Sequence, residues 1–267
     1  MNLANIRLVV TDMDGTLLDS NHQVSTRFFE LQHELSRRGI RFAAASGRQY
    51  QSIAVKLSPI LDELFIIAEN GGLLRHQGRE MLSTPLEPSL RDEILDALED
   101  LRETHAVLCG KDRAYLLPPS PAFRKQLGEY YTEFEYLERL QGFPGEIMKI
   151  AVYHFESAEK FIYPAVRSYE DRLKVKVSGA HWVDLSDRKA HKGHALQLLQ
   201  RELEVSPEET LVFGDYNNDL EMLAQAEFSF AMANAHPNVL HAARYQTLSN
   251  DEQGVENILE QLLQQLD

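Results

Sequence analysis

The first third of the chain alternates short apolar runs with segments in which apolar residues recur every three or four positions. The short runs at residues 6–11, 41–45 and 64–68 predict buried strands. Between the first two runs, Ser25 predicts the start of a helix and Gly39 its end. The apolar residues that share one face of this helix are Phe28, Leu31 and Leu35. Strands that alternate with helices predict βαβ units and a parallel sheet.

A different pattern begins after about residue 72. Gln77-Gly78 separates two short apolar segments and predicts a hairpin, and helical spacing returns over residues 90–101. The other elements predicted for this part are strands at 106–109, 114–117, 147–155, 173–178 and 182–185, and a helix over 158–169. From Lys192 the alternation of helix and strand resumes, with a strand at 210–213.

The predicted fold is therefore α/β, with a Rossmann-like core whose parallel sheet is interrupted in sequence by an inserted α+β domain. We expect residues 1–83 and 186–267 to form the discontinuous core, and residues 84–185 to form the insert.

Composition narrows the class of protein. The chain has 267 residues, 43% apolar and 25% charged, which is ordinary for a globular protein. A net charge of −14 argues against nucleic-acid and anionic-membrane partners, because both require clustered Lys and Arg. The single cysteine, Cys109, excludes an internal disulfide and a cysteine-based zinc site. Because no signal-peptide pattern or bilayer-length apolar run is found, a cytoplasmic location is expected.

Two pairs of acidic residues follow predicted strands. Asp12 and Asp14 come directly after the first strand, and Asp215 and Asp219 follow the strand at 210–213. Since parallel strands end at one edge of a sheet, the four carboxylates are expected to converge there. Carboxylates of one sign attract a cation, and Mg²⁺ prefers such oxygen ligands. An Asx-type turn that closes the first strand is the alternative interpretation of the first pair.

A calcium loop does not explain the second pair. Asp215, Asn217 and Asp219 imitate the first ligands of an EF-hand. However, Leu220 and Ala226 stand at the positions where that loop needs Gly and Glu.

Three further residues suggest an anion site. The Ser46 hydroxyl, the Gly47 backbone N–H and the Lys192 ammonium could each contact one oxygen of a phosphoryl group. Lys192 also begins a predicted helix, whose N-terminus attracts anions. On these residues alone, a helix-start serine and a solvated lysine remain open alternatives.

The order of these motifs resembles the haloacid dehalogenase superfamily of phosphotransferases, most closely its Cof-type phosphatases with a class IIB cap. The motifs are Asp-x-Asp-Gly-Thr at 12–16, Ser-Gly-Arg at 46–48, Lys-Gly at 192–193 and Gly-Asp-x-x-Asn-Asp at 214–219. The segments Glu69–Gly72 and Ala231–Ala235 also resemble family sequences. The chain departs from the family at Asp187 and Lys189, where Pro and Gly are usual, so Lys189 is a minor rival to Lys192.

The resemblance implies a role for each matching residue. Asp12 would be the nucleophile, Asp14 the general acid and base, and Ser46 and Lys192 would hold the phosphoryl oxygens. The implied Mg²⁺ ligands are Asp12, Asp14 through its backbone carbonyl and Asp215, with Asp219 either as a further ligand or as a support for the other ligands. The implied substrate-binding residues are Gly47, Arg48, Asn70 and Asn218, while Thr16 would order the first loop.

We therefore expect a Mg²⁺-dependent phosphatase that hydrolyses small phosphorylated metabolites, such as sugar phosphates, through an aspartyl-phosphate intermediate. A phosphomutase of the same superfamily and a non-catalytic metabolite-binding regulator are the alternatives. The expected assembly is a monomer or small homo-oligomer without nucleic-acid or membrane partners. The candidate substrate contacts in the insert are Lys149, Lys176, His181 and Trp182.

Overall fold

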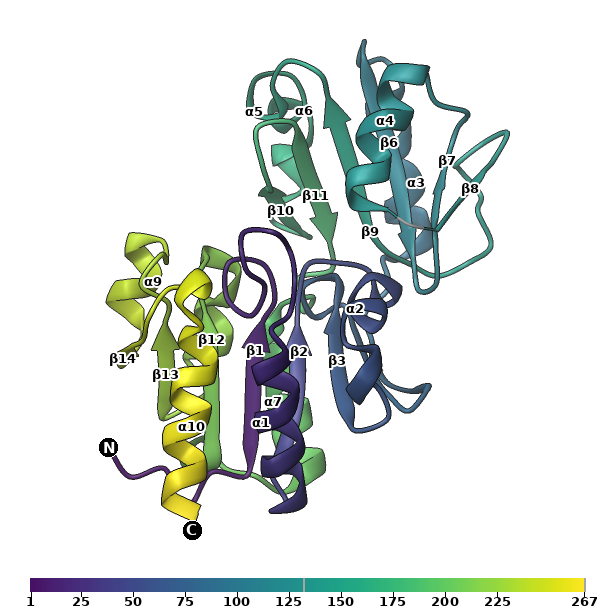
Figure 1. The fold of residues 1–267 in the computed structure, drawn as a ribbon. Helices are drawn as coiled ribbons and strands as arrows, with labels where there is room; N and C mark the ends of the chain where they lie inside the picture. Colours follow the sequence, from purple (N-terminus) through teal and green to yellow (C-terminus); the bar gives the residue numbers. More distant parts are fainter. Residues whose placement is uncertain (132, 267) are drawn as a thin grey trace. The chain divides into compact units, whose positions relative to one another are not determined.

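The computed structural model describes residues 1–131 and 133–266. The chain divides into two compact units (Figure 1). The first unit contains Met1–Gly47, Ile53–Leu82 and His191–Asp267, and the second contains Arg48–Ser52 and Ser83–Ala190.

An eight-stranded sheet forms the centre of the first unit, in the order β14-β13-β12-β1-β2-β3-β4-β5. Its strands are β1 (Leu8–Asp12), β2 (Arg41–Ala45), β3 (Leu64–Ala68), β4 (Leu73–His76), β5 (Arg79–Ser83), β12 (Thr210–Gly214), β13 (Phe228–Ala231) and β14 (Tyr245–Gln246). The strands from β14 to β3 are parallel, and β4 runs antiparallel to β3. The predicted α/β fold with a parallel sheet is confirmed.

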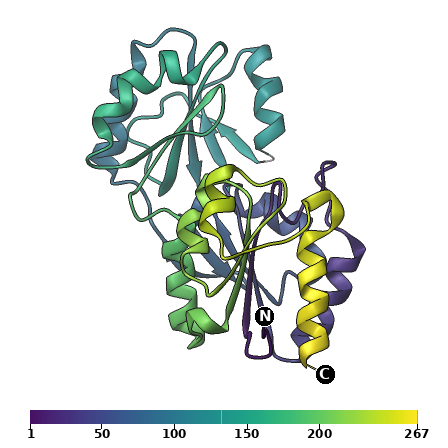
Figure 2. The ribbon, with the colours of Figure 1, turned by 90° about the vertical axis from the view of Figure 1, so that its left-hand side faces the viewer.

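Helices cover both faces of this sheet, with α1 beside α10 on one face and α7 on the other (Figure 2). The helices are α1 (Thr26–Arg37), α2 (Tyr50–Lys56), α7 (Lys192–Leu203), α8 (Leu220–Leu223), α9 (Pro237–Ala242) and α10 (Gly254–Leu266). The predicted cap of α1 is confirmed, because the Ser25 side chain accepts a hydrogen bond from the Phe28 N–H. The predicted apolar face of α1 is buried.

Strand register places the sequence motifs at one edge of this sheet. Asp12 is the last residue of β1 and pairs with Ala45, so Ser46 follows at the same level. On the other side of β1, Thr11 pairs with Phe213, one residue before the end of β12. The carboxyl ends of the three central strands thus meet, which is where open α/β sheets bind ligands.

The second unit contains a six-stranded sheet in the order β10-β11-β9-β6-β7-β8. Its strands are β6 (Thr104–Gly110), β7 (Ala114–Leu116), β8 (Phe134–Tyr136), β9 (Ile147–His154), β10 (Lys174–Val177) and β11 (Trp182–Ser186). All neighbouring pairs are antiparallel except β7 with β8. The helices are α3 (Pro88–Glu99), α4 (Pro121–Tyr130), α5 (Ala158–Phe161) and α6 (Tyr163–Val166).

Proline determines where two helical segments of this unit begin or end. The helix predicted over 158–169 is divided into α5, α6 and a 3-10 turn at Arg167–Tyr169, because Pro164 has no N–H to continue the first helix. Conversely, the proline-rich stretch at 118–121 begins helix α4. The Ser120 side chain accepts from the Phe123 N–H at 3.2 Å, and Pro121 occupies the first turn, where its missing N–H costs nothing.

Among residues 1–131 and 133–266, no helix combines the length and the apolar character needed to cross a bilayer.

Two glycines allow close backbone packing at the start of α7. A Cβ on Gly71 would lie 2.3 Å from the His191 carbonyl oxygen, and Gly71 has a φ of +99°. A Cβ on Gly193 would lie 2.4 Å from the Glu221 carbonyl oxygen. Only glycine fits at these approaches, so the first turn of α7 is fixed between the turn after β3 and helix α8.

Gly71→Ala should lower the free energy of unfolding by about 3 kcal/mol or more, because the methyl group meets fixed backbone and the positive φ strains the residue. Gly78→Ala is the matched control, since Gly78 has a φ of +74° but nothing within 4 Å of a Cβ. The control should lose only about 1–2 kcal/mol. Urea unfolding of both variants measures the difference, and equal losses would show that the contact with His191 carries no cost.

Candidate functional site

Asp12 and Lys192 form a buried ion pair at the edge described above. Asp12 is 5% exposed at the end of β1, and Lys192, the first residue of α7, is fully buried. The Lys192 ammonium donates to Asp12 Oδ1, and also to Asp219 Oδ1 at 2.7 Å. A buried ammonium must be paired to remain charged, and two carboxylates from different segments provide this pairing.

The position of Lys192 follows from how α7 begins. The His191 side chain caps the helix, with Nδ1 accepting from the His194 N–H at 3.1 Å. The tight packing at Gly71 and Gly193 then holds the first turn in place. Lys192 therefore enters the site from a rigid helix end.

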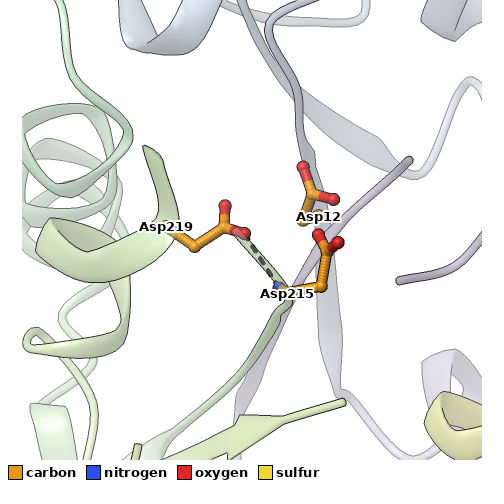
Figure 3. A group of neighbouring side chains, drawn as sticks. All are labelled: Asp12, Asp215 and Asp219. Carbon is orange, nitrogen blue, oxygen red and sulfur yellow. Dashed lines mark hydrogen bonds between the residues drawn. The ribbon is translucent and has the colours of Figure 1, made fainter. Parts of the chain in front are cut away.

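Asp215 and Asp219 come from the turn after β12, as Figure 3 shows together with Asp12. Asp219 Oδ2 accepts from the backbone N–H groups of Asp215 and Tyr216, at 3.0 and 3.1 Å. Thr16 Oγ1 donates to Asp215 Oδ1 at 3.2 Å, which links the first loop to this turn. Both oxygens of Asp219 are thus engaged by the protein, whereas Asp215 is half-buried.

Burial and the charges of neighbouring groups shift the pKa values of Asp12, Asp215 and Lys192. The pKa of Asp12 is raised by its burial, with Lys192 opposing the shift and Asp219 and Asp215 adding to it. Burial, followed by the charge of Asp219, raises the pKa of Asp215 to about 6. Burial lowers the pKa of Lys192, but Asp12 and Asp219 outweigh it, so the net shift is upward and the ammonium stays charged.

This group of residues fits a divalent metal ion. Asp12, Asp215 and Asp219 each offer an oxygen within 4.8 Å of the others. Lys192 supplies one positive charge against three carboxylates, so negative charge remains in excess at a largely buried place. Hard oxygen donors with excess negative charge suit Mg²⁺.

The fourth acidic residue, Asp14, is placed differently. Its side chain is 43% exposed, and Oδ1 lies 3.7 Å from His22 Nδ1. The next residue, Gly15, has a φ of +78°, and a Cβ there would lie 2.3 Å from Asp215 Oδ2. The loop therefore packs closely against Asp215 while the Asp14 carboxylate stands outside the group of three described above.

The predicted phosphoryl-binding residues lie on the neighbouring strand ends. Ser46 is buried directly after β2, with its N–H bonded to the Ile67 carbonyl and its carbonyl bonded to the Asn70 N–H, each at 2.9 Å. Asn70 adopts a φ of +56°, and its Oδ1 accepts from Asn218 Nδ2 at 3.0 Å. A Cβ on Gly47 would lie 3.1 Å from the Asn70 amide. Hydrogen bonds and close packing at Asn70 thus connect the motifs that follow β2, β3 and β12.

The remaining predicted residues belong to the second unit. Arg48 Nη1 donates to Ser52 Oγ at 3.4 Å. The Lys189 N–H donates to Asp187 Oδ1 at 2.8 Å, within an Asp-initiated turn at 187–190.

The four candidate contacts of the insert differ in burial. Lys149 is 7% exposed and its Nζ lies 3.7 Å from Asp184 Oδ2. Trp182 packs in the core against Tyr153, with ring centroids 4.9 Å apart. His181 and Lys176 are both half-buried.

Sequence reasoning missed the residues that hold the first loop from outside. Asn234 Nδ2 donates to the Gly15 carbonyl at 2.8 Å, and Asn250 Nδ2 donates to the Leu18 carbonyl at 2.9 Å. Asn234 lies in the segment 231–235 that resembles a family sequence, so this resemblance could have indicated a role for Asn234. Asn250 stands in a polar turn that no motif marks.

Comparison with known proteins agrees with this geometry. The family model of the haloacid dehalogenase-like hydrolases matches residues 9–259. The 5-amino-6-(5-phospho-D-ribitylamino)uracil phosphatase YbjI of Escherichia coli is 32% identical over 97% of this chain and 97% of its own. The structure of SMU.1108c from Streptococcus mutans UA159 is 29% identical, with a TM-score of 0.86 over 97% of this chain and 99% of that one. The HAD subclass IIB sugar phosphatase BT4131, 19% identical over 96% of this chain and 98% of its own, shares the fold with a TM-score of 0.82. The chain therefore belongs to the haloacid dehalogenase-like hydrolases, which confirms the superfamily, the fold and the hydrolase activity that its motifs predict.

Proposed function

We propose that this hydrolase is a Mg²⁺-dependent phosphatase of small phosphorylated metabolites that works through an aspartyl phosphate on Asp12. The observation that carries the proposal is the buried Asp12 carboxylate, held by Lys192 at the end of a central strand and within reach of Asp215. The paired Lys192 ammonium favours the anionic form of this carboxylate, which is the form that attacks. Covalent catalysis divides one difficult displacement into two easier ones.

In the first step, Asp12 forms a bond to phosphorus while the bond from phosphorus to the leaving oxygen breaks. Because Lys192 occupies Oδ1, we assign Oδ2 of Asp12 as the attacking atom. Asp14 gives its proton to the leaving oxygen. In the second step, Asp14 takes a proton from water as the water oxygen attacks phosphorus, and the Asp12 carboxylate is released. Such acid–base assistance is typically worth about 10²–10⁴-fold in rate.

We assign Asp12, Asp215 and the backbone carbonyl of Asp14 as the ligands of Mg²⁺. When bound, the ion would neutralise charge on the phosphoryl oxygens and on the attacking carboxylate. For Asp219, the sequence left open a role as a fourth ligand or as a support for the others. Its oxygens already accept from Lys192 and from two backbone N–H groups. We therefore propose that Asp219 acts by positioning Lys192 and the turn that carries Asp215.

We assign phosphoryl binding to Ser46, Lys192 and the Gly47 N–H, supported by the N-terminus of α7. The hydrogen bond between Asn218 and Asn70 fixes the turn that backs Gly47. We retain Arg48, Asn70 and Asn218 as proposed contacts to substrate.

We propose that residues 84–185 form a cap domain that selects the leaving group, while 1–83 and 186–267 form the catalytic core. The Escherichia coli relative is named for a phosphorylated ribityl compound. This name supports a phosphomonoester of a sugar, a polyol or a related metabolite as the substrate class. A screen of phosphorylated metabolites with release of free phosphate as readout tests this assignment, and activation by a bisphosphate would instead indicate a phosphomutase.

Asp12→Asn should lower kcat by about 10³-fold or more while leaving the fold intact, because the amide has the same shape but no nucleophilic oxygen anion. Steady-state kinetics with 4-nitrophenyl phosphate and the circular dichroism spectrum provide the measurement. Asp62→Asn, at an exposed position of the first unit, is the matched control and should keep wild-type turnover. Near-normal activity of the Asp12 variant would exclude the proposed nucleophile.

Removal of Mg²⁺ with excess EDTA should reduce turnover to background, and added Mg²⁺ should restore it. Magnesium at a hundred times its Kd should also raise the free energy of unfolding by about 2.7 kcal/mol, since it binds only the folded site. Asp215→Asn should weaken this stabilisation, as followed by thermal unfolding without substrate. Unchanged turnover in EDTA, or equal stabilisation of wild type and variant, would contradict the proposed site.

A further inference from the structure

The loop of residues 14–23, which we call the Asp14 loop, is held by side chains from the C-terminal part of the chain. Asn234 donates to the Gly15 carbonyl at 2.8 Å and Asn250 to the Leu18 carbonyl at 2.9 Å. The N–H of Ser20 donates to Asp251 Oδ1 at 2.7 Å. Successive points along the loop are thus held by two neighbouring segments, one that follows β13 and one that precedes α10.

Two of the residues that hold the loop, Asn234 and Asn250, are also bonded to each other. The Asn250 N–H donates to Asn234 Oδ1 at 3.1 Å. Asn250 lies in a 3-10 turn at Asn250–Glu252, which is capped by Ser249 and leads into α10. The loop is therefore held through α10 and its preceding turn.

The tip of the Asp14 loop has hydrogen bonds of its own. Asp19 Oδ1 accepts from the N–H groups of Asn21 and Gln23, at 2.9 and 2.8 Å. Lys56 Nζ donates to the His22 carbonyl at 2.8 Å from the other side. Because the tip keeps its own hydrogen bonds when an anchor is lost, the anchors determine the position of the loop.

Asn250 is the anchor that bonds the residue paired with Asp14. Its partner Leu18 is completely buried and forms an isolated β-bridge with Asp14. The bond from Asn250 to Leu18 is also partly buried, whereas those of Asn234 and Asp251 to the loop are exposed. Exposed hydrogen bonds compete with water, so among these three bonds that of Asn250 contributes most to the position of Asp14.

The two proposed catalytic carboxylates, Asp12 and Asp14, are held in place by different parts of the structure. Asp12 ends a strand that pairs with β2 on one side and β12 on the other, and this pairing does not involve Asn250. Asp14 lies beyond the strand and relies on the loop. A change at Asn250 should therefore disturb the acid and leave the nucleophile in place.

We propose that Asn250 is a positioning residue for Asp14, acting through the Leu18 carbonyl to set where the general acid meets the leaving oxygen. The inference rests on the proposed role of Asp14 as general acid. Displacement of a reacting group by about 1 Å can cost about 10²-fold in rate, so a single anchor is enough to matter.

Hydrolysis of two aryl phosphates of similar shape can be compared to distinguish a loss of acid assistance from a general loss of structure. The phenolate released from 4-nitrophenyl phosphate is stabilised by the nitro group and needs little help from an acid. Phenolate released from phenyl phosphate is as basic as a tyrosine side chain, whose pKa is about 10, and requires the proton. Because kcat/KM reports steps up to departure of the phenol, the ratio of the two kcat/KM values measures acid assistance.

Asn250→Asp keeps the shape of the side chain but removes its N–H donor, and Asn250→Ala removes both. Each variant should lower kcat/KM by about tenfold for phenyl phosphate and by less than about threefold for 4-nitrophenyl phosphate. Asn257→Ala is the matched control, since Asn257 is exposed on α10 and its side-chain oxygen accepts a hydrogen bond from Gln261 Nε2. The control should leave both values unchanged.

Equal losses on the two substrates, or failure of both Asn250 variants to fold by circular dichroism, would show a structural role only and overturn the inference. Asp14→Asn is run in parallel to test the proposed function separately. If Asp14→Asn affects both substrates equally, the acid assignment itself fails. If Asp14→Asn discriminates between them and the Asn250 variants do not, only the positioning role is rejected.

Discussion

The buried ammonium of Lys192, bonded to Asp12 and Asp219, is the interaction on which the rest of the site depends. An unpaired charge at a fully buried position would be very costly, so the three groups must be brought together by the fold. They come from the end of β1, the start of α7 and the turn after β12. One ion pair network thus ties together segments that are 27 and 180 residues apart in sequence.

Close backbone packing makes this network possible. Gly71 and Gly193 let the first turn of α7 approach neighbouring carbonyls, and Gly15 lets the first loop approach Asp215. Asp219 uses its second oxygen to bind the backbone of the Asp215 turn. Since Lys192 neutralises only part of the negative charge, the same packing that buries the carboxylates raises the proton affinity of Asp12 and Asp215 and favours a metal cation between them.

The site therefore combines two kinds of support. Asp12 ends a strand that is paired on both sides, and it pairs itself with Ala45 of β2, which suits the attacking role proposed for it. Asp14 stands on a loop that is fastened by hydrogen bonds from distant parts of the chain, and its side chain is partly exposed. The proposed nucleophile on a strand and the proposed acid on an anchored loop can respond differently to mutation, although only one residue separates them.

The sequence by itself determined the alternation of strands and helices in the core, the cap of α1 and the acidic motifs at the ends of β1 and β12. These follow from local signals, namely apolar periodicity, capping residues and motif order. It could not place Asp14 apart from the other three acids, show that both oxygens of Asp219 are already bonded, or reveal Asn250 beside Leu18. Only the tertiary structure decided these points, because each depends on atoms that are remote in sequence and meet through packing, which leaves no local pattern in the chain.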